Sequence, residues 1–401
     1  MNKRYILIIS CLILAVTFIV SCEKLLPSSP ADDELLDGPV DGLSPEEQKQ
    51  FLNGDIAFND EIFTPEKGLG PRFVSTSCGS CHAGDGKGTP FTTVIRFTAA
   101  ADSTGFTIRP QGSTQLQNRA IPGYTPEQLP AGLPFSKFTP PANTGLGFLD
   151  LVSDADLLAM TDSLDANNDG ISGNVNWNNI PSFVTLRKGT VTNNGKYICR
   201  FGKKASVFDL LQQAATAYNQ DIGITSIFLP RDVYSGLEID PEVSSQTVHD
   251  VVFYLKTLKA PVQRTPNDAD VVAGKNLFIQ TGCESCHKQT LKTSFSSIEA
   301  LNNKEFHPYT DLLLHDMGSG LDDGFTEGGA KNSEWRTAPL WGLGLAPNSQ
   351  GGQYFLLHDG RAKSIEEAIT IHGGEAQQSK QKFQQLQVDQ KQKIIKFLES
   401  L

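Results

Sequence analysis

The pentapeptide C-x-x-C-H occurs twice in this chain, at residues 78–82 and 283–287. Two thiols at this spacing can form thioethers to the two vinyl groups of one haem, and the adjacent imidazole can bind its iron. A zinc ribbon brings two cysteine pairs much closer together in sequence, and a thioredoxin-like dithiol needs a βαβ context. The motif therefore predicts two covalently bound c-type haems and redox chemistry. The attachment residues are Cys78, Cys81, His82, Cys283, Cys286 and His287.

His82 and His287 are the expected proximal iron ligands, because each follows the second cysteine of its motif. The chain has no histidine between His82 and His249. We therefore expect the first iron to be five-coordinate or to hold water, as a peroxide-activating site requires. A plain cytochrome c would give the second iron a methionine, for which Met317 is the available residue.

The N-terminal residues resemble an export signal. Lys3 and Arg4 precede an apolar run over residues 5–20, and the small Ser21 stands before Cys22. This resembles the cleavage site of bacterial lipoproteins, so we expect residues 1–21 to be a signal peptide and Cys22 to carry lipid. An uncleaved membrane anchor is the alternative, although the run is short for a full span. Both readings predict an exported protein, lipid-anchored or embedded in the bacterial cell envelope and facing the periplasm or the cell surface.

The chain is acidic, with a formal net charge of −11. Loss of residues 1–21 would remove two basic residues and no acids, which makes the balance more negative. This argues against a nucleic-acid partner and favours a neutral or basic electron-donor protein. We therefore expect the protein to attach to the membrane through its lipid rather than through electrostatic attraction.

Glycine, proline and asparagine are plentiful, so we expect modest helices separated by long coil segments. The predicted fold is mostly α, with two cytochrome c-like domains. A weak repeat supports this division, since Gly54 and Phe58 precede the first motif as Gly274 and Phe278 precede the second. The expected parts are a flexible tether over residues 22–43 and two haem domains over residues 44–260 and 261–401.

Several further blocks carry a family resemblance that covers about residues 46–401. The chain resembles the bacterial di-haem c-type oxidoreductases, whose members are labelled thiol oxidoreductase or peroxidase. It is more distantly similar to di-haem cytochrome c peroxidases and to the related enzyme that matures methylamine dehydrogenase. The blocks lie at residues 68–71, 78–88, 169–173, 200–202, 221–225, 314–318, 336–344 and 358–361.

The resemblance implies further site residues. In the peroxidase relatives the distal ligand of the second haem follows an H-D-G block by fourteen residues, which here gives His372 after His358. Met317 remains the alternative. Asp150 falls where the family usually has a glutamate that assists O–O cleavage, and Glu127 is its rival. Residues 91–145 are short and divergent, so the resemblance is weakest around the expected distal pocket of the first haem.

Three other features could serve the site. Asp165, Asn167 and Asp169 match the first half of a calcium loop, although Asn176 stands where the usual glutamate would be, and an Asx-rich turn is the alternative. Arg361 could pair with a haem propionate. Trp335 and Trp341 could relay electrons between haems or simply pack against them.

The sequence thus predicts a peroxidase-like di-haem oxidoreductase. Its N-terminal haem would activate a small oxidant such as peroxide, and its C-terminal haem would transfer or store electrons. The alternative is a non-catalytic di-haem electron carrier, which would have two six-coordinate irons.

Overall fold

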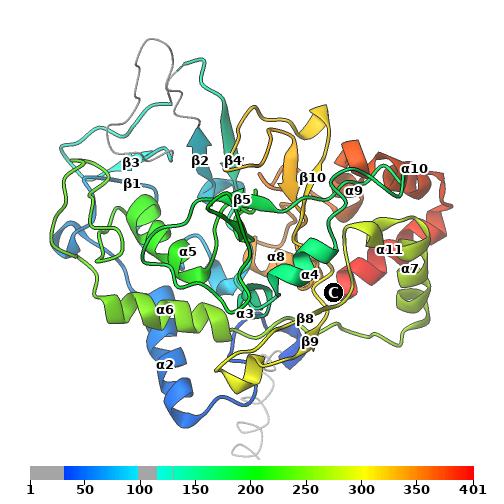
Figure 1. Ribbon diagram of the computed structural model, residues 1–401, viewed down its shortest axis with the longest axis horizontal. Helices are drawn as coiled ribbons and strands as arrows, with labels where there is room; N and C mark the ends of the chain where they lie inside the picture. The colour runs from blue at the N-terminus through cyan, green and yellow to red at the C-terminus, as the bar shows by residue number, and fades with distance from the viewer. Residues whose placement is uncertain (1–30, 98–114, 130) are drawn as a thin grey trace, which may run out of the picture. The chain divides into compact units, whose positions relative to one another are not determined.

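The computed structural model describes residues 31–97, 115–129 and 131–401 (Figure 1). The expected signal peptide, Cys22 and the first part of the tether, residues 22–30, lie outside these residues. The chain divides into two compact units, Met1–Leu35 and Leu36–Leu401. The first unit contains one described 3-10 turn, η1 (Asp32–Glu34), and the second contains all other described elements. No helix in the described ranges is both long enough and apolar enough to cross a bilayer.

The expectation of a mostly α fold is wrong, because only 35% of the structure is helical and 12% is strand. The strands are two to four residues long, too short for an alternating pattern to be visible in the sequence. The helices are α2 (Pro45–Asp55), α3 (Leu146–Asp150), α4 (Asp154–Ala159), α5 (Leu210–Ala217), α6 (Ser245–Thr257), α7 (Ala269–Gln280), α8 (Ala346–Ser349), α9 (Ile365–Ile371), α10 (Gln377–Gln385) and α11 (Val388–Ser400), with π-helical turns η2 (Ile56–Asp60) and η6 (Tyr218–Ile222).

The strands form five small antiparallel sheets within the described residues. The pairs are β1 with β3, β2 with β4, β8 with β9, and β10 with β11, while β7 lies between β5 and β6. The strands are β1 (Arg72–Phe73), β2 (Val94–Phe97), β3 (Arg119–Ala120), β4 (Phe135–Phe138), β5 (Asn176–Asn178), β6 (Thr192–Asn193), β7 (Lys196–Cys199), β8 (Leu291–Lys292), β9 (Glu305–Phe306), β10 (Leu314–Asp316) and β11 (Glu334–Arg336).

Helix α2 packs against α6, and α7 packs against α11 (Figure 1). The two pairs use the same device, a glycine at the crossing. A Cβ on Gly54 would overlap the carbonyl oxygen of Asp250, and a Cβ on Gly274 would overlap that of Lys393. The helices can therefore approach closely only because these two positions lack a side chain. The weak sequence repeat thus corresponds to a repeated helix crossing.

The two helix pairs are also alike at the C-terminal ends of α6 and α11, where each helix accepts a backbone hydrogen bond from a glycine. Gly145 donates its N–H to the carbonyl of Leu258 at 3.3 Å, and Gly342 donates to that of Leu401 at 2.7 Å. Each motif also lies against its helix pair through an aromatic residue, since Phe58 contacts the His82 ring and Phe278 contacts that of His287. The protein therefore presents both motifs from equivalent scaffolds.

Two main apolar cores surround these scaffolds. The first contains α2, α5 and α6, and it also includes residues from beyond position 260, such as Phe306 and Trp341. The second is built by α7, α9, α10 and α11. The first core thus contains residues from both sides of position 260, where we expected the boundary between the two haem domains.

Candidate functional site

The first motif presents a neutral imidazole with one free nitrogen. His82 Nδ1 lies 3.0 Å from the carbonyl oxygen of Pro141. A carbonyl can only accept, so Nδ1 carries the proton and Nε2 keeps its lone pair. Burial lowers the pKa of His82 to about 4, which keeps the ring neutral at physiological pH.

The second motif has the same arrangement. His287 Nδ1 donates to the carbonyl of Tyr309 at 3.0 Å, and burial lowers the pKa of His287 to about 4. In both motifs the cysteines are free thiols rather than a disulfide. A backbone carbonyl that fixes the tautomer of a histidine is a common support for a metal ligand.

His372 is the third histidine held in this way. It lies at the C-terminus of α9, and its Nδ1 donates to the carbonyl of Ala368 at 2.6 Å. Burial lowers the pKa of His372, and the charge of His372 contributes in turn to lowering that of His287. Ala368 and Ile371, close to His372 in the chain, lie in the same apolar core as Phe278, which contacts the His287 ring. The pairing of His287 and His372 on the second iron remains a prediction.

Met317, the alternative ligand, lies beside the segment that carries His372, since Ile371 belongs to the same apolar cluster. Its side chain lies against an apolar cluster that contains Phe138, Leu321, Phe325 and Trp335. Its backbone N–H donates to the carbonyl of Ser333 at 2.9 Å. These surroundings suit a packing role.

Asp150, expected near the peroxide, is buried in α3 and ion-paired with Arg187 at 3.0 Å and Lys256 at 3.5 Å. Burial alone would raise the pKa of Asp150, but the charges of Arg187, Lys256 and Arg200 outweigh it and lower the pKa. The carboxylate is therefore held ionised, which makes it a poor proton donor.

Glu127, the rival of Asp150, accepts a hydrogen bond from the backbone N–H of Gln117 at 2.7 Å. It also lies 3.7 Å from Arg72. The structure thus places Asp150 and Glu127 in separate polar networks.

A carboxyl group that sequence reasoning missed lies closer to the first motif. Asp221, in η6, is partly buried, and desolvation raises its pKa although a hydrogen bond from Gln115 opposes this effect. Its charge acts on Cys78 and Cys81. Asp221 belongs to a block that carries the family resemblance, and π-helical turns are frequent at functional sites, but neither signal alone distinguishes it from other acids.

The expected calcium ligands already have partners. Both oxygens of Asp165 accept the Gly170 N–H, and Asp169 accepts from Ile171 N–H and from the Asn167 amide. Asn176 is buried and hydrogen-bonded to the backbone of Lys204 and Glu327. These hydrogen bonds form an Asx-rich turn, and calcium binding remains a prediction.

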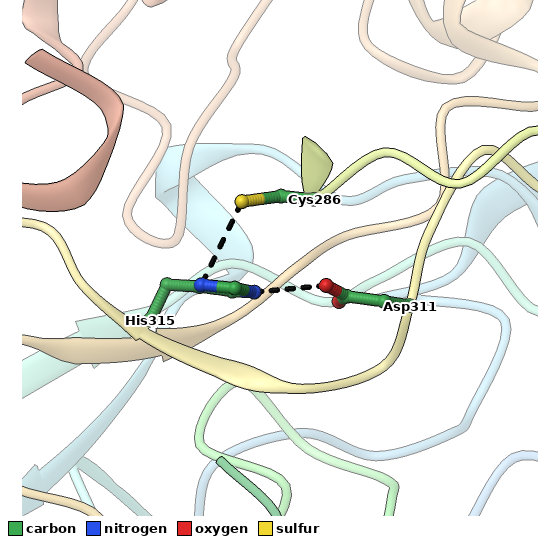
Figure 2. Close-up of side chains that lie close together, drawn as sticks. All are labelled: Cys286, Asp311 and His315. Carbon is green, nitrogen blue, oxygen red and sulfur yellow. Dashed lines mark hydrogen bonds and ion pairs between the residues drawn. The ribbon is translucent and has the colours of Figure 1, made fainter. Parts of the chain in front are cut away.

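His315 lies between Asp311 and Cys286 (Figure 2), and it is also ion-paired with Glu375. Its Nε2 lies 2.9 Å from Asp311 and its Nδ1 lies 2.6 Å from Glu375, while the Cys286 sulfur is 3.6 Å from Nδ1. Burial alone would lower the pKa of His315, but the hydrogen bonds to Asp311, Cys286 and Glu375 raise it to about 12.

The three clustered side chains Cys286, Asp311 and His315 could in principle hold a metal ion. Both ring nitrogens of His315 donate to carboxylates, however, so neither has a lone pair for a metal. We conclude that this cluster is an ion-paired support beside the second motif. The sequence alone does not reveal this role, because Glu375 is 60 residues away from His315 in the chain.

His358 and Trp335 stack at 3.7 Å between ring centroids, at an angle of 10°. His358 lies on a cavity of about 580 Å³, which Asp323 and Arg361 also line. Arg361 pairs with Asp359 at 2.7 Å. Trp341 lies elsewhere, against Phe306 in the first core.

The residues present at both motifs fit haem. Each motif brings two free thiols together with a neutral imidazole whose Nε2 is unengaged, as iron ligation requires. When bound, haem supplies reversible iron redox chemistry. The protein supplies the fixed tautomers and the close-packed scaffold behind each ring.

Comparison with known proteins agrees with this donor set. Residues 137–401, which include the second motif, match the family described as "Di-haem oxidoreductase, putative peroxidase". No curated protein matches the chain. A solved structure of Kuenenia stuttgartiensis hydrazine synthase, pressurised with 20 bar xenon, is similar at 13% sequence identity and a TM-score of 0.41. The alignment covers 94% of this chain and 98% of the hydrazine synthase chain. That score is too low to support an argument. The family match covers more than half of the residues, and the chain therefore belongs to the di-haem oxidoreductases.

Proposed function

We propose that this protein is a peroxidase-type oxidoreductase with two covalently attached c-type haems. The His82 site takes the small oxidant, and the site of His287 and His372 holds or passes electrons. An electron-donor protein supplies the reducing equivalents. The proposal deepens the family assignment by giving the two sites different roles.

One observation supports this asymmetry most strongly. Among the seven histidines of the chain, three donate Nδ1–H to a backbone carbonyl and keep Nε2 free. His287 and His372 lie beside the same apolar core, in which Phe278 and Ile371 both pack, whereas His82 contacts Phe58 of the other core. His307 and His249 are exposed, His315 is held by carboxylates, and His358 stacks on Trp335 with its Nε2 3.7 Å from Asp323. The described residues thus provide two imidazoles for one iron and one for the other.

The protein groups have separate tasks in this proposal. Pro141 holds the His82 ring in one tautomer, and Tyr309 and Ala368 do the same for His287 and His372. Peroxide cleavage needs a group that can hold and return a proton. Asp221 suits this task better than Asp150, because burial favours its protonated form while Asp150 is kept ionised by its ion pairs.

A spectroscopic experiment tests the proposal. The protein would be produced with its export signal in a host competent in cytochrome c maturation. We expect two haems per chain that remain attached after denaturation, and an oxidised electron paramagnetic resonance spectrum with one high-spin and one low-spin signal. Stopped-flow mixing with hydrogen peroxide should change the high-spin species first.

The outcomes separate the two candidate functions. Two low-spin signals and no response to peroxide would support the electron carrier instead. A colourless protein would exclude both. A His307→Ala variant is a matched control, since this exposed histidine should leave both signals unchanged.

We further propose that the protein is exported and lipid-anchored through Cys22. The proposal rests on the charged and apolar N-terminal residues and on the agreement with haem attachment, which bacteria carry out outside the cytoplasm. Detergent partitioning of the wild type and of a Cys22→Ser variant tests it. Equal partitioning would contradict the lipid anchor.

A further inference from the structure

Five cationic side chains in the described ranges have a pKa that burial lowers: Lys87, Arg200, Lys203, Lys204 and Arg336. Two of them are surrounded by oxygen atoms. Arg200 forms an ion pair with Asp154, and Lys204 donates to the carbonyls of Lys331, Asn332 and Glu334 at 2.9–3.0 Å. These two are satisfied in the way that buried charges usually are.

The other three lack an anionic partner. Within the part of the chain that the structure describes, no carboxylate lies within ion-pair distance of Lys87, Lys203 or Arg336, and neither lysine ammonium has a hydrogen-bond acceptor. Arg336 donates to the backbone carbonyls of Gly202 and Thr337. Asp359 acts on both lysines from a distance, but its carboxylate is paired with Arg361. All three are partly buried, and a charge that is largely removed from water without a counter-charge is costly, so a missing anion is the simplest explanation.

The three cations lie together beside the first motif. Arg336 donates its backbone N–H to the carbonyl of Lys203 at 2.9 Å, and the charges of Lys87 and Arg336 both act on Lys203. The charge of Lys203 acts in turn on His82. On its other side, Arg336 feels the charge of Asp311, which belongs to the cluster next to Cys286. Arg336 also pairs with Leu314 of β10, next to His315, so the group extends from the side of the first motif to the cluster beside Cys286.

We propose that Lys87, Lys203 and Arg336 bind haem propionate groups where the two haem sites meet. This inference rests on the proposed function, because it requires haem at the motifs. Each haem carries two carboxylates on one edge, which could neutralise these three cations. The guanidinium of Arg336 suits a carboxylate in fork geometry, while each ammonium acts as a compact charge.

Arg361, which the sequence suggested for this role, is less suitable in the structure. It is already paired with Asp359, and 40% of its side chain is exposed. The residues Lys87, Lys203 and Arg336 are less exposed than Arg361, and none of them has a carboxylate within ion-pair distance in the described ranges. Sequence inspection could not find it, because its members come from three distant segments.

The test compares Lys203→Met with Lys203→Arg and with Lys188→Met, an exposed lysine that serves as the matched control for net charge. Loss of a positive charge beside a haem favours the oxidised form. We expect Lys203→Met to shift the reduction equilibrium of one haem about tenfold, which corresponds to about 59 mV for one electron. Lys203→Arg and Lys188→Met should retain the wild-type midpoint potentials in a spectroelectrochemical titration. Lys87→Met should act in the same direction as Lys203→Met.

Thermal unfolding of the haem-loaded variants gives a second readout. If propionates pair with Lys203, its replacement by methionine should lower the unfolding temperature of the loaded protein. If Lys203 has no anionic partner, the same replacement should raise it, because an uncompensated charge is removed. Two bound haems with unshifted potentials and a raised unfolding temperature would overturn this inference alone. Wild-type protein without haem would overturn the proposed function and this inference with it.

Discussion

His315 shows how a single buried residue changes which ligands are available to the second site. Its two ring nitrogens both face carboxylates, and Glu375 also accepts from the backbone and hydroxyl of Ser172. Burial alone would raise the pKa of Glu375, but the hydrogen bonds from His315 and Ser172 lower it to about 2. Glu375 follows His372 by three residues, so this network also fixes the segment that presents His372. His315, which contacts Cys286, is thereby a support, and His372 is left as the candidate sixth ligand of the second iron.

Replacement of His372 tests this assignment. In a His372→Ala variant, the second iron should lose its sixth ligand and change from low-spin to high-spin in the oxidised state. The oxidised electron paramagnetic resonance spectrum should then contain high-spin signals only. Met317→Leu, a volume-conserving change at the rival position, should leave the low-spin signal in place. If Met317→Leu removes that signal and His372→Ala does not, the ligand assignment is reversed.

At the scale of the elements, both motifs depend on a close helix crossing. Gly274 in α7 lies against the backbone of α11, where a Cβ would also come within 2.9 Å of the Phe397 Cβ. Phe397 contacts Phe278, which in turn contacts the His287 ring. A shift of α11 would therefore reach the proximal histidine through two aromatic side chains.

A Gly274→Ala variant should reveal this dependence. Overpacking at the crossing should destabilise the protein by about 2 kcal/mol, since the helices must separate to make room for the methyl group. The measurement is the free energy of unfolding of the haem-loaded protein. Gly320→Ala is the control, because a Cβ there would meet nothing within 4 Å. Equal stability of the two variants would contradict the tight crossing.

Local signals predicted local structure well. The hydroxyls of Ser44 and Ser364 cap α2 and α9 as their sequence contexts indicate, and the two pentapeptides direct attention to His82 and His287. The strands escaped prediction because pairs such as β10 and β11 are held by contacts between distant segments rather than by their own pattern. Groups such as Lys87 with Lys203 escaped for the same reason, since only the tertiary fold brings them together.

At the scale of the whole molecule, positive side chains gather near the motifs although the chain as a whole is acidic. The chain has a net charge of −11, yet the partly buried cations Lys87, Lys203 and Arg336 lie near the motifs. The surface seen by an approaching protein is therefore more acidic than the interior around the first motif. Such a surface favours encounters with positively charged partners.

This charge predicts how electron delivery should respond to salt. Reduction of the oxidised protein by a basic one-electron donor protein should slow by roughly tenfold between about 0.01 and 0.15 M ionic strength, because screening shortens the range of attraction. An acidic donor of similar potential should show the opposite trend, since screening weakens repulsion. Stopped-flow absorbance of the haem bands at several salt concentrations measures both rates. If both donors react at rates independent of salt, long-range attraction does not guide the encounter, and the donor must instead recognise a local uncharged surface.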